Sequence, residues 1–196
     1  MMNKLFSGFT NKTAENLLLD AGAFFKNFIV GTDTFESAVT AGKLLGATKG
    51  GGQFSAIPEI RNVEVDGVKG KAEGMQMIDS WEVKMSANII EITKEVLAAA
   101  IGASEIDTTT SEDYDIIKGK TEIELSDYIG NITYVGRKSG SSEPIIIQIY
   151  NSFNKNGLTL QTQPKNEAVV ALEFEGHFKP EELDKVPFEI FYPKAS

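Results

Sequence analysis

The stretch that decides the fold is WEVKMSANIIEITKEVLAAAIG, residues 81–102. Its first half alternates between apolar and polar residues. The apolar set is Trp81, Val83, Met85, Ala87 and Ile89, and the polar set is Glu82, Lys84, Ser86 and Asn88. A period of two over this length predicts a strand with one face against a core and the other face in water.

The second half of the stretch changes to a helical period. Thr93 stands where a helix N-cap is expected, and Glu95 falls in the first turn, where the helix dipole favours an acidic residue. Val96, Leu97, Ala100 and Ile101 share one face at helical spacing. Gly102 follows as a typical residue past a helix C-terminus. The sequence therefore predicts a long strand that leads directly into a short helix covering one end of a sheet.

Most other segments with a clear pattern are strands. Strands are expected at residues 23–30, 59–66, 68–77, 114–118, 121–125, 131–137, 144–153, 158–161, 168–178 and 188–192. Asp66-Gly67 and Asn156-Gly157 are strong hairpin-turn signals, whereas residues 31–41 and 103–112 lack a period and are expected to be connections. About ten strands and one helix predict a mainly β fold, an antiparallel β-sandwich or partial barrel with one flanking α-helix. We expect a single domain over residues 1–196, with an N-terminal arm at about residues 1–20.

A glycine-rich segment, LLGATKGGGQFSAIP at residues 44–58, interrupts the strand patterns. Gly46, Gly50, Gly51 and Gly52 lie within seven residues, which predicts an exposed, mobile loop at about residues 46–58. The glycine spacing fits neither a phosphate-binding loop nor a dinucleotide fingerprint. We therefore expect a loop that becomes ordered on meeting a partner.

Composition excludes several classes of protein. The 196 residues contain no cysteine, which excludes disulfides, thiolate zinc sites and a cysteine nucleophile, and suits a reducing cytoplasm. The net charge of −9 disfavours binding to phosphate backbones. No apolar run reaches the roughly 18 residues of a membrane span, so no membrane insertion is expected. The first twelve residues lack the hydrophobic region of a signal peptide, so we expect no export by that route.

Catalytic residues are not apparent in the sequence. His177 is the only histidine; it is expected on the wet face of a strand, and no nucleophile-elbow motif accompanies it. The pairs Glu122/Glu124 and Glu173/Glu175 each place two carboxylates on one strand face, as in some glycosidases, but this spacing is common on any wet strand. The sequence predicts no catalytic, cofactor-binding or metal site and no enzyme, which leaves a structural or binding protein.

Several segments, taken in order, resemble a known family. They are LLDAGAFFKNF (residues 18–28), the glycine-rich LLGATKGGGQFSAIPEIRNVEVDGVKGK (44–71), SWEVKMSANIIEITKE (80–95), TEIELSDYIGNITYVG (121–136) and NEAVVALEFEGHFKPEELDKVPFEIFYP (166–193). Together they are similar to the major tail tube protein of long, non-contractile bacteriophage tails. The resemblance covers nearly the whole chain, and it lies in the run of segments, since no single motif is diagnostic.

The resemblance implies a structural virion protein with a β-sandwich and a flanking helix. Six copies would close into a ring, and stacked rings would form the tail tube, a conduit for genome delivery. Implied partners are further copies of the chain, the tape measure protein, the tail terminator and the tail-tip or baseplate proteins. Double-stranded DNA would pass without specific binding. The implied location is the virion tail, and the host cytoplasm during assembly.

Two sets of residues are candidates for this role. A lumen that passes DNA should carry carboxylates and neutral polar groups. The candidate lumen residues are Glu82, Ser86, Asn88, Thr159, Gln161, Glu173 and Glu175. Lys84 breaks this pattern and is expected to pair with Glu82 or Glu173; alternatively, the face is simply outer surface. The candidate inter-ring loop comprises Gly46, Lys49, Gly50, Gly51, Gly52, Gln53 and Phe54.

Three alternatives stay open. A soluble β-sandwich binding module for carbohydrate or peptide would need an exposed aromatic patch, whereas most aromatic residues here alternate with the apolar sets. A type VI secretion-like tube protein would share the fold and the self-assembly. A hydrolase with paired carboxylates would need one of the glutamate pairs to be catalytic.

Overall fold

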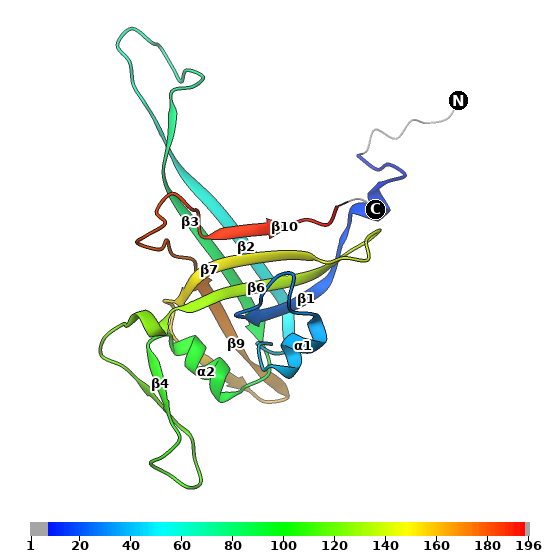
Figure 1. Cartoon of the computed structure of the whole chain (residues 1–196), viewed down its shortest axis with the longest axis vertical. Helices are drawn as coiled ribbons and strands as arrows, with labels where there is room; N and C mark the ends of the chain where they lie inside the picture. Colours follow the sequence, from blue (N-terminus) through cyan, green and yellow to red (C-terminus); the bar gives the residue numbers. More distant parts are fainter. Residues whose placement is uncertain (1–7, 195–196) are drawn as a thin grey trace.

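A computed structural model describes residues 8–194 and shows a mainly β fold with two short α-helices (Figure 1). The strands are β1 (Leu18–Lys26), β2 (Thr48–Asn62), β3 (Gln76–Ile89), β4 (Ser104–Asp107), β5 (Ile116–Gly119), β6 (Ile129–Lys138), β7 (Ile145–Asn154), β8 (Leu160–Gln163), β9 (Asn166–Glu175) and β10 (Phe188–Phe191). The helices are α1 (Phe35–Thr40) and α2 (Lys94–Ile101), with 3-10 turns η1 (Thr13–Asn16) and η2 (Leu125–Asp127). The expected fold class, an antiparallel β-sandwich or partial barrel with a flanking helix, is confirmed.

The main sheet has two halves that face each other. Its strand order is β1-β6-β7-β9-β3-β2, with β10 beside β7 and β8 beside β9. Within residues 8–194, the half formed by β1, β6, β7 and β10 joins the half formed by β2, β3, β9 and β8 through two residue pairs, Phe153 with Glu175 and Asn154 with Phe174. At the open side, β1 and β2 approach without forming a ladder, and a Cβ on Gly51 would lie 3.7 Å from Ala21 Cβ. The sheet therefore curls into a partial barrel.

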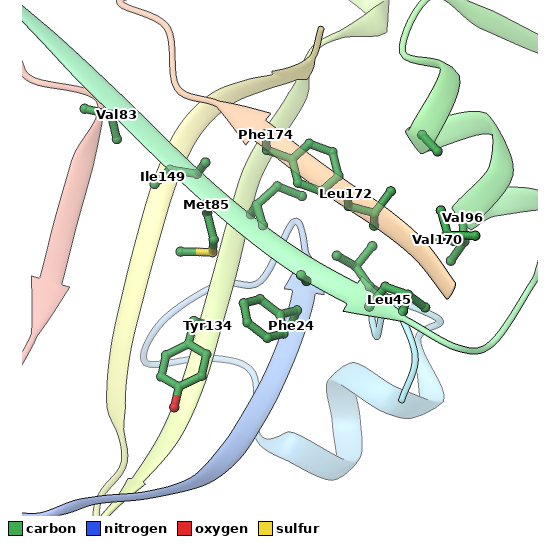
Figure 2. Close-up of a cluster of buried hydrophobic side chains, with 14 residues drawn as sticks. Phe24, Leu45, Val83, Met85, Val96, Tyr134, Ile149, Val170, Leu172 and Phe174 are labelled. Carbon is green, nitrogen blue, oxygen red and sulfur yellow. The ribbon is translucent and has the colours of Figure 1, made fainter. Parts of the chain in front are cut away.

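The hydrophobic core fills the space between the two halves, as Figure 2 shows. Phe24, Tyr134 and Ile149 enter from the first half, and the Phe24 and Tyr134 rings lie 5.3 Å apart. Met85 and Phe174 enter from the second half, and both are about 1% exposed. Because each fully buried side chain of this size contributes about 1.5–3 kcal/mol, this layer is the main stabilising element of the fold.

The predicted strand-to-helix unit is confirmed. Residues 83, 85, 87 and 89 of β3 are buried, and the residues between them are not. The Thr93 hydroxyl accepts a hydrogen bond from Val96 N at 3.2 Å, and Gly102 ends α2 with a φ of 84°. Asn154 Nδ2 donates to the carbonyl of Ala100 at 3.0 Å, which fixes α2 to the end of β7.

The glycine-rich segment is a strand, so the prediction of a mobile loop at residues 46–58 was wrong. Residues 52–62 form a long antiparallel ladder with β3, after a bulge between Thr48 and Gly52. Gly50 and Gly51 have φ values of 83° and 71°, which glycine adopts without strain, so two of the glycines form the bulge. Glycine therefore bends an edge strand here instead of ending it.

Helix α1 lies within residues 31–41, where the sequence predicts a connection. Thr34 and Ser37 form a reciprocal capping box at its start. Its Ala38 is fully buried with Phe25 and Phe28 in a second, smaller core. The Thr-x-x-Ser spacing was the available signal, but a helix of six residues gives too little periodicity to be recognised.

Three smaller expectations also differ from the structure. β4 lies within the expected loop at 103–112, and the expected strand at 121–125 is instead irregular chain leading into η2. β1 begins at Leu18, and Asp20 (φ 64°) marks an irregularity in its pairing with β6, so the last residues of the expected arm are strand. Residues 1–7 of that arm lie outside the described part of the chain.

The β2–β3 hairpin extends well past the body of the molecule, as Figure 1 shows in cyan and green. Residues 63–75 connect the two strands and include a turn at Asp66-Gly67. The expected hairpin turn directly between strands at 59–66 and 68–77 was therefore wrong, because β2 ends at Asn62 and β3 begins at Gln76. The β4–β5 hairpin projects at the opposite end of the long axis. The molecule is therefore a compact double layer with two extended hairpins.

Candidate functional site

The second half of the sheet carries the candidate site on the face opposite the core. Ser86 of β3 pairs with Glu173 of β9, and Asn88 pairs with Ala171. Glu82 lies further along the same face of β3, and Glu175 further along β9. The structure thus brings five of the seven lumen candidates onto one surface, which we call the polar face: Glu82, Ser86, Asn88, Glu173 and Glu175.

The remaining two lumen candidates lie beside β9. Gln161 of β8 pairs with Val169, which is on the same side of β9 as Glu173, so Gln161 extends the polar face. Thr159 is exposed in the connection before β8 and belongs to no ladder within the described residues. Leu160, which pairs with Val170, is 45% exposed, so the expected apolar side of this short strand is only half covered.

The strand β2 adds a third row to the polar face. Gln53 pairs with Ser86, Ser55 with Lys84, and Ile57 with Glu82. Gln53 was a candidate for the inter-ring loop, but its register places it beside the lumen candidates. Ser55 and Ile57 are not among the sequence-based candidates, because the glycine pattern predicts a loop over most of β2.

The lysines at the polar face are both paired with carboxylates. Lys84 Nζ contacts Glu82 and lies 4.0 Å from a Glu173 oxygen, as expected, while Lys155 contacts Glu175. The hydrogen bond from Lys84 lowers the pKa of the Glu82 carboxyl, and the same bond raises the pKa of Lys84. Because the side chains are partly exposed, each pair contributes little to stability. Their effect is to neutralise both ammonium groups locally, which leaves a face with excess carboxylate.

The other glycine-segment candidates are spread along β2. Gly46 precedes the strand, and Lys49 pairs with Glu167 at 2.8 Å. Phe54 points into the core, where its ring lies 5.7 Å from that of Phe188. These residues therefore do not form one exposed loop.

Gly52 occupies the most crowded position in the segment. A Cβ there would lie 2.1 Å from the Ser86 carbonyl oxygen and 2.4 Å from Phe24 Cζ. Only a residue without a side chain allows β2, β3 and β1 to approach this closely. The glycine is thus required by packing at the open side of the barrel.

A groove follows this open side, between the edges of β1 and β2. Its floor is apolar and includes Phe24, Met85 and Tyr134, and its rims include Asp20 and residues 50–54. No ionisable cluster lies in it, and its shape follows from the incomplete closure of the barrel.

His177 is not on a wet strand face, contrary to the expectation. It follows β9, is half-buried, and meets the Tyr128 ring edge-on at 5.1 Å between centroids. Its Nδ1 lies 3.0 Å from the Asn151 carbonyl oxygen, which can only accept, so Nδ1 carries the proton. The imidazole therefore joins β7 to the end of β9, and no serine or threonine hydroxyl contacts it within residues 8–194.

Three of the four paired glutamates, Glu124, Glu173 and Glu175, have lysine partners in the structure. Glu124 contacts Lys120 at 2.8 Å, and Lys120 also contacts Asp127 at 2.7 Å, which ties η2 to the end of β5. Glu173 and Glu175 take part in the lysine contacts of the polar face. Within residues 8–194, no group of three or more histidine, cysteine or acidic side chains has the arrangement of a metal site.

Two comparisons with known proteins give no relative. No family model matches the chain, and no curated protein matches it. None of the helices in residues 8–194 is long and apolar enough to cross a membrane.

Proposed function

We propose that this chain is a structural subunit that assembles into rings and tubes, as the major tail tube protein of a long, non-contractile phage tail. The observation that carries the proposal is the sheet half β2-β3-β9-β8, which presents a carboxylate-rich face and ends in two edges with no ladder partner in the described residues. A long unpaired edge is an aggregation hazard in a monomer, but it is a natural contact in an oligomer.

The two edges are different from each other, which favours a ring. If β2 of one copy pairs beside β8 of the next, the interface is head-to-tail, and a rotation that closes produces a ring with the same polar face repeated around it. Stacking of such rings produces a tube. The number of copies, six, comes from the family resemblance alone.

The charge of the polar face suits a lumen for DNA. Glu82, Glu173 and Glu175 repel phosphates, and the ammonium groups of Lys84 and Lys155 are already held by these carboxylates. Under this proposal, DNA passes without binding, and the tape measure protein, the tail terminator and the tail-tip or baseplate proteins are the other partners. The proposed location is the virion tail, reached from the host cytoplasm.

The glycine-rich segment is not proposed as the inter-ring contact. The glycine segment is held in the β2–β3 ladder, so we no longer expect a mobile loop there that orders on stacking. No observation in the described residues favours a soluble binding module: the exposed aromatic residues Phe9, Phe35, Tyr114 and Tyr192 lie on different elements. A type VI secretion-like tube would use the same edges and face.

The test is assembly of the purified chain, with one variant at the β2 edge and one matched control. Ile57 on β2 and Ile190 on β10 are exposed strand isoleucines, at 56% and 52%. We expect rings or tubes of the unmodified chain in negative-stain images, alone or with tail-tip proteins. Ile57→Asp should remain a folded monomer, because it places a charge at the joining edge, and Ile190→Asp should still assemble.

Monomers under every condition, including with tail-tip proteins, would contradict the proposal. Tubes from Ile57→Asp equal to those of the unmodified chain would contradict the assignment of the β2 edge. Circular dichroism of both variants checks that each remains folded.

A further inference from the structure

The connection between β7 and β8 contains a reactive dipeptide step. Asn156-Gly157 is the one asparagine–glycine step in the sequence, and Asn156 is exposed. We propose that Asn156 is a self-modification site, which converts spontaneously to aspartate and isoaspartate and so adds a negative charge beside the polar face. This inference does not depend on the proposed function.

The chemistry needs only water. The Gly157 backbone nitrogen loses its proton to solvent base and attacks the Asn156 side-chain carbonyl carbon. A carbon–nitrogen bond forms, and the side-chain amide nitrogen leaves as ammonia, which gives a five-membered succinimide. Water then adds to either ring carbonyl and opens the ring, so the products are aspartate or isoaspartate. The sum is one amide and one water converted to one carboxylic acid and one ammonia.

The turn leaves both reacting groups accessible. Gly157 has no side chain to block the approach, and a Cβ there would meet nothing within 4 Å. Within residues 8–194, neither the Asn156 side-chain amide nor the Gly157 N–H forms a hydrogen bond, and the one bond at this step is from Asn156 N to Asn154 Oδ1 at 3.0 Å. The nucleophile and the electrophile are therefore not held apart by other contacts.

A neighbouring asparagine provides an internal comparison. Asn154 is 2% exposed, its Nδ2 donates to the Ala100 carbonyl at 3.0 Å, and it lies within β7. Its successor is Lys155, whose side chain hinders attack by the backbone nitrogen. Two asparagines two positions apart in the sequence thus differ in exposure, in hydrogen bonding and in the residue that follows.

The modification changes the surroundings of the polar face. Lys155 is adjacent in sequence and contacts Glu175. A carboxylate at position 156 competes for this ammonium group and adds to the local negative charge. Isoaspartate also inserts one extra backbone carbon into the connection to β8.

The experiment is incubation of the folded full-length chain in mildly alkaline buffer, followed by peptide mapping with mass spectrometry and an isoaspartate-specific methyl-transfer assay. We expect Asn156 to lose its amide at least about tenfold faster than Asn154, and the product to migrate as a more acidic species. Asn156→Gln, whose reaction would need a larger ring, should lose the fast phase and the isoaspartate signal.

Equal rates at Asn156 and Asn154 in the folded chain would overturn the inference. So would a fast phase that persists in Asn156→Gln. A sample in urea gives the rates of amide loss for the unfolded chain, where the rates at Asn156 and Asn154 should differ less than in the folded protein. The same ratio of rates in both states would show that sequence alone controls the reaction. That result would also overturn the inference.

Discussion

The strands β2 and β3 are partners in one hairpin, yet the sequence predicts one of them well and the other poorly. From Val83 to Ile89, β3 alternates between buried and partly exposed residues, and there it forms a strand for reasons contained in its own sequence. β2 contains Gly50, Gly51, Gly52 and Pro58, all of which are unfavourable in regular strands. It is a strand because β3 offers a complete ladder and because the core accepts Phe54. An edge strand can thus be determined by its neighbour instead of by the period of its own sequence.

The largest effect is expected on β3. Met85→Ala removes a side chain that is 1% exposed and leaves a cavity between the two sheet halves, so we expect a loss of about 3 kcal/mol. Ser86→Ala, one residue further and on the polar face, should change the free energy of unfolding by less than about 0.5 kcal/mol. Urea unfolding midpoints of both variants measure the contrast. Similar losses at the two positions would mean that β3 is not two-faced.

The next effect tests β2. Gly52→Ala introduces a Cβ where the Ser86 carbonyl and the Phe24 ring already lie within 2.4 Å, so we expect a loss of about 2 kcal/mol from overpacking. Gly70→Ala, near the tip of the same hairpin with nothing within 4 Å, is the matched control and should be nearly neutral. A neutral Gly52→Ala, read by the same urea titration, would show that β2 does not lie against β1 and β3 as described.

These differences explain how much of the fold could be predicted. Alternation of apolar and polar residues is a signal within one segment, so the sequence predicts strands at β6, β7, β9 and the second half of β3. Helix capping also depends on neighbouring residues, so the sequence predicts the caps at Thr93 and Gly102. β2 is a strand because of its ladder with β3, and β4 because of a short pairing with β5. Neither β4 nor most of β2 has an apolar–polar alternation from which a strand could be predicted. The pairing order of the strands, which creates the open side between β1 and β2, is also non-local.

A smaller effect is expected at the end of β3, where local sequence is again decisive. Thr93→Ala removes the hydroxyl that accepts from Val96 N at 3.2 Å, and the loss should be about 1 kcal/mol. Thr93→Ser keeps an accepting hydroxyl and should recover most of the stability. Thermal unfolding of the three proteins measures this; an unchanged midpoint for Thr93→Ala would show that packing alone holds α2.

The smallest effect concerns the polar face, where β3 and β9 meet. The Lys84 hydrogen bond lowers the Glu82 pKa from its ordinary 4.5, so Lys84→Gln should raise this pKa, as followed by NMR titration. Ser55→Ala, on β2 opposite Lys84, should leave it unchanged. Because the folded-state pKa is lowered, the pair stabilises the fold above pH 4.5 and loses this effect as the pH falls through the lowered value. The raised pKa of Lys84 sets the alkaline limit, since its contribution disappears as the pH rises through that value.

The residues of the candidate site could be predicted where the strands that carry them could be predicted. Alternation placed Glu82, Ser86 and Asn88 on one side of β3, and Glu173 and Glu175 on one side of β9, but it could not show that the two sides are the same surface. That depends on register, and a slip of one residue would have put Glu173 in the core. Gln53 and Ser55 were missed for the reason that β2 was missed.

The narrow connection between β7 and β9 has a mechanical consequence. Two residue pairs form the ladder that joins the halves of the sheet in the described residues, and the Asn154 side chain holds this point against α2. Beside this ladder, His177 N, just past β9, donates to the Tyr150 carbonyl of β7 at 3.1 Å. The ladder between the halves is therefore short, and the packed side chains of the core make most of the contact between them. Separating the halves would therefore require Phe24, Met85 and Phe174 to leave the shared core, while the ladders within each half could stay intact.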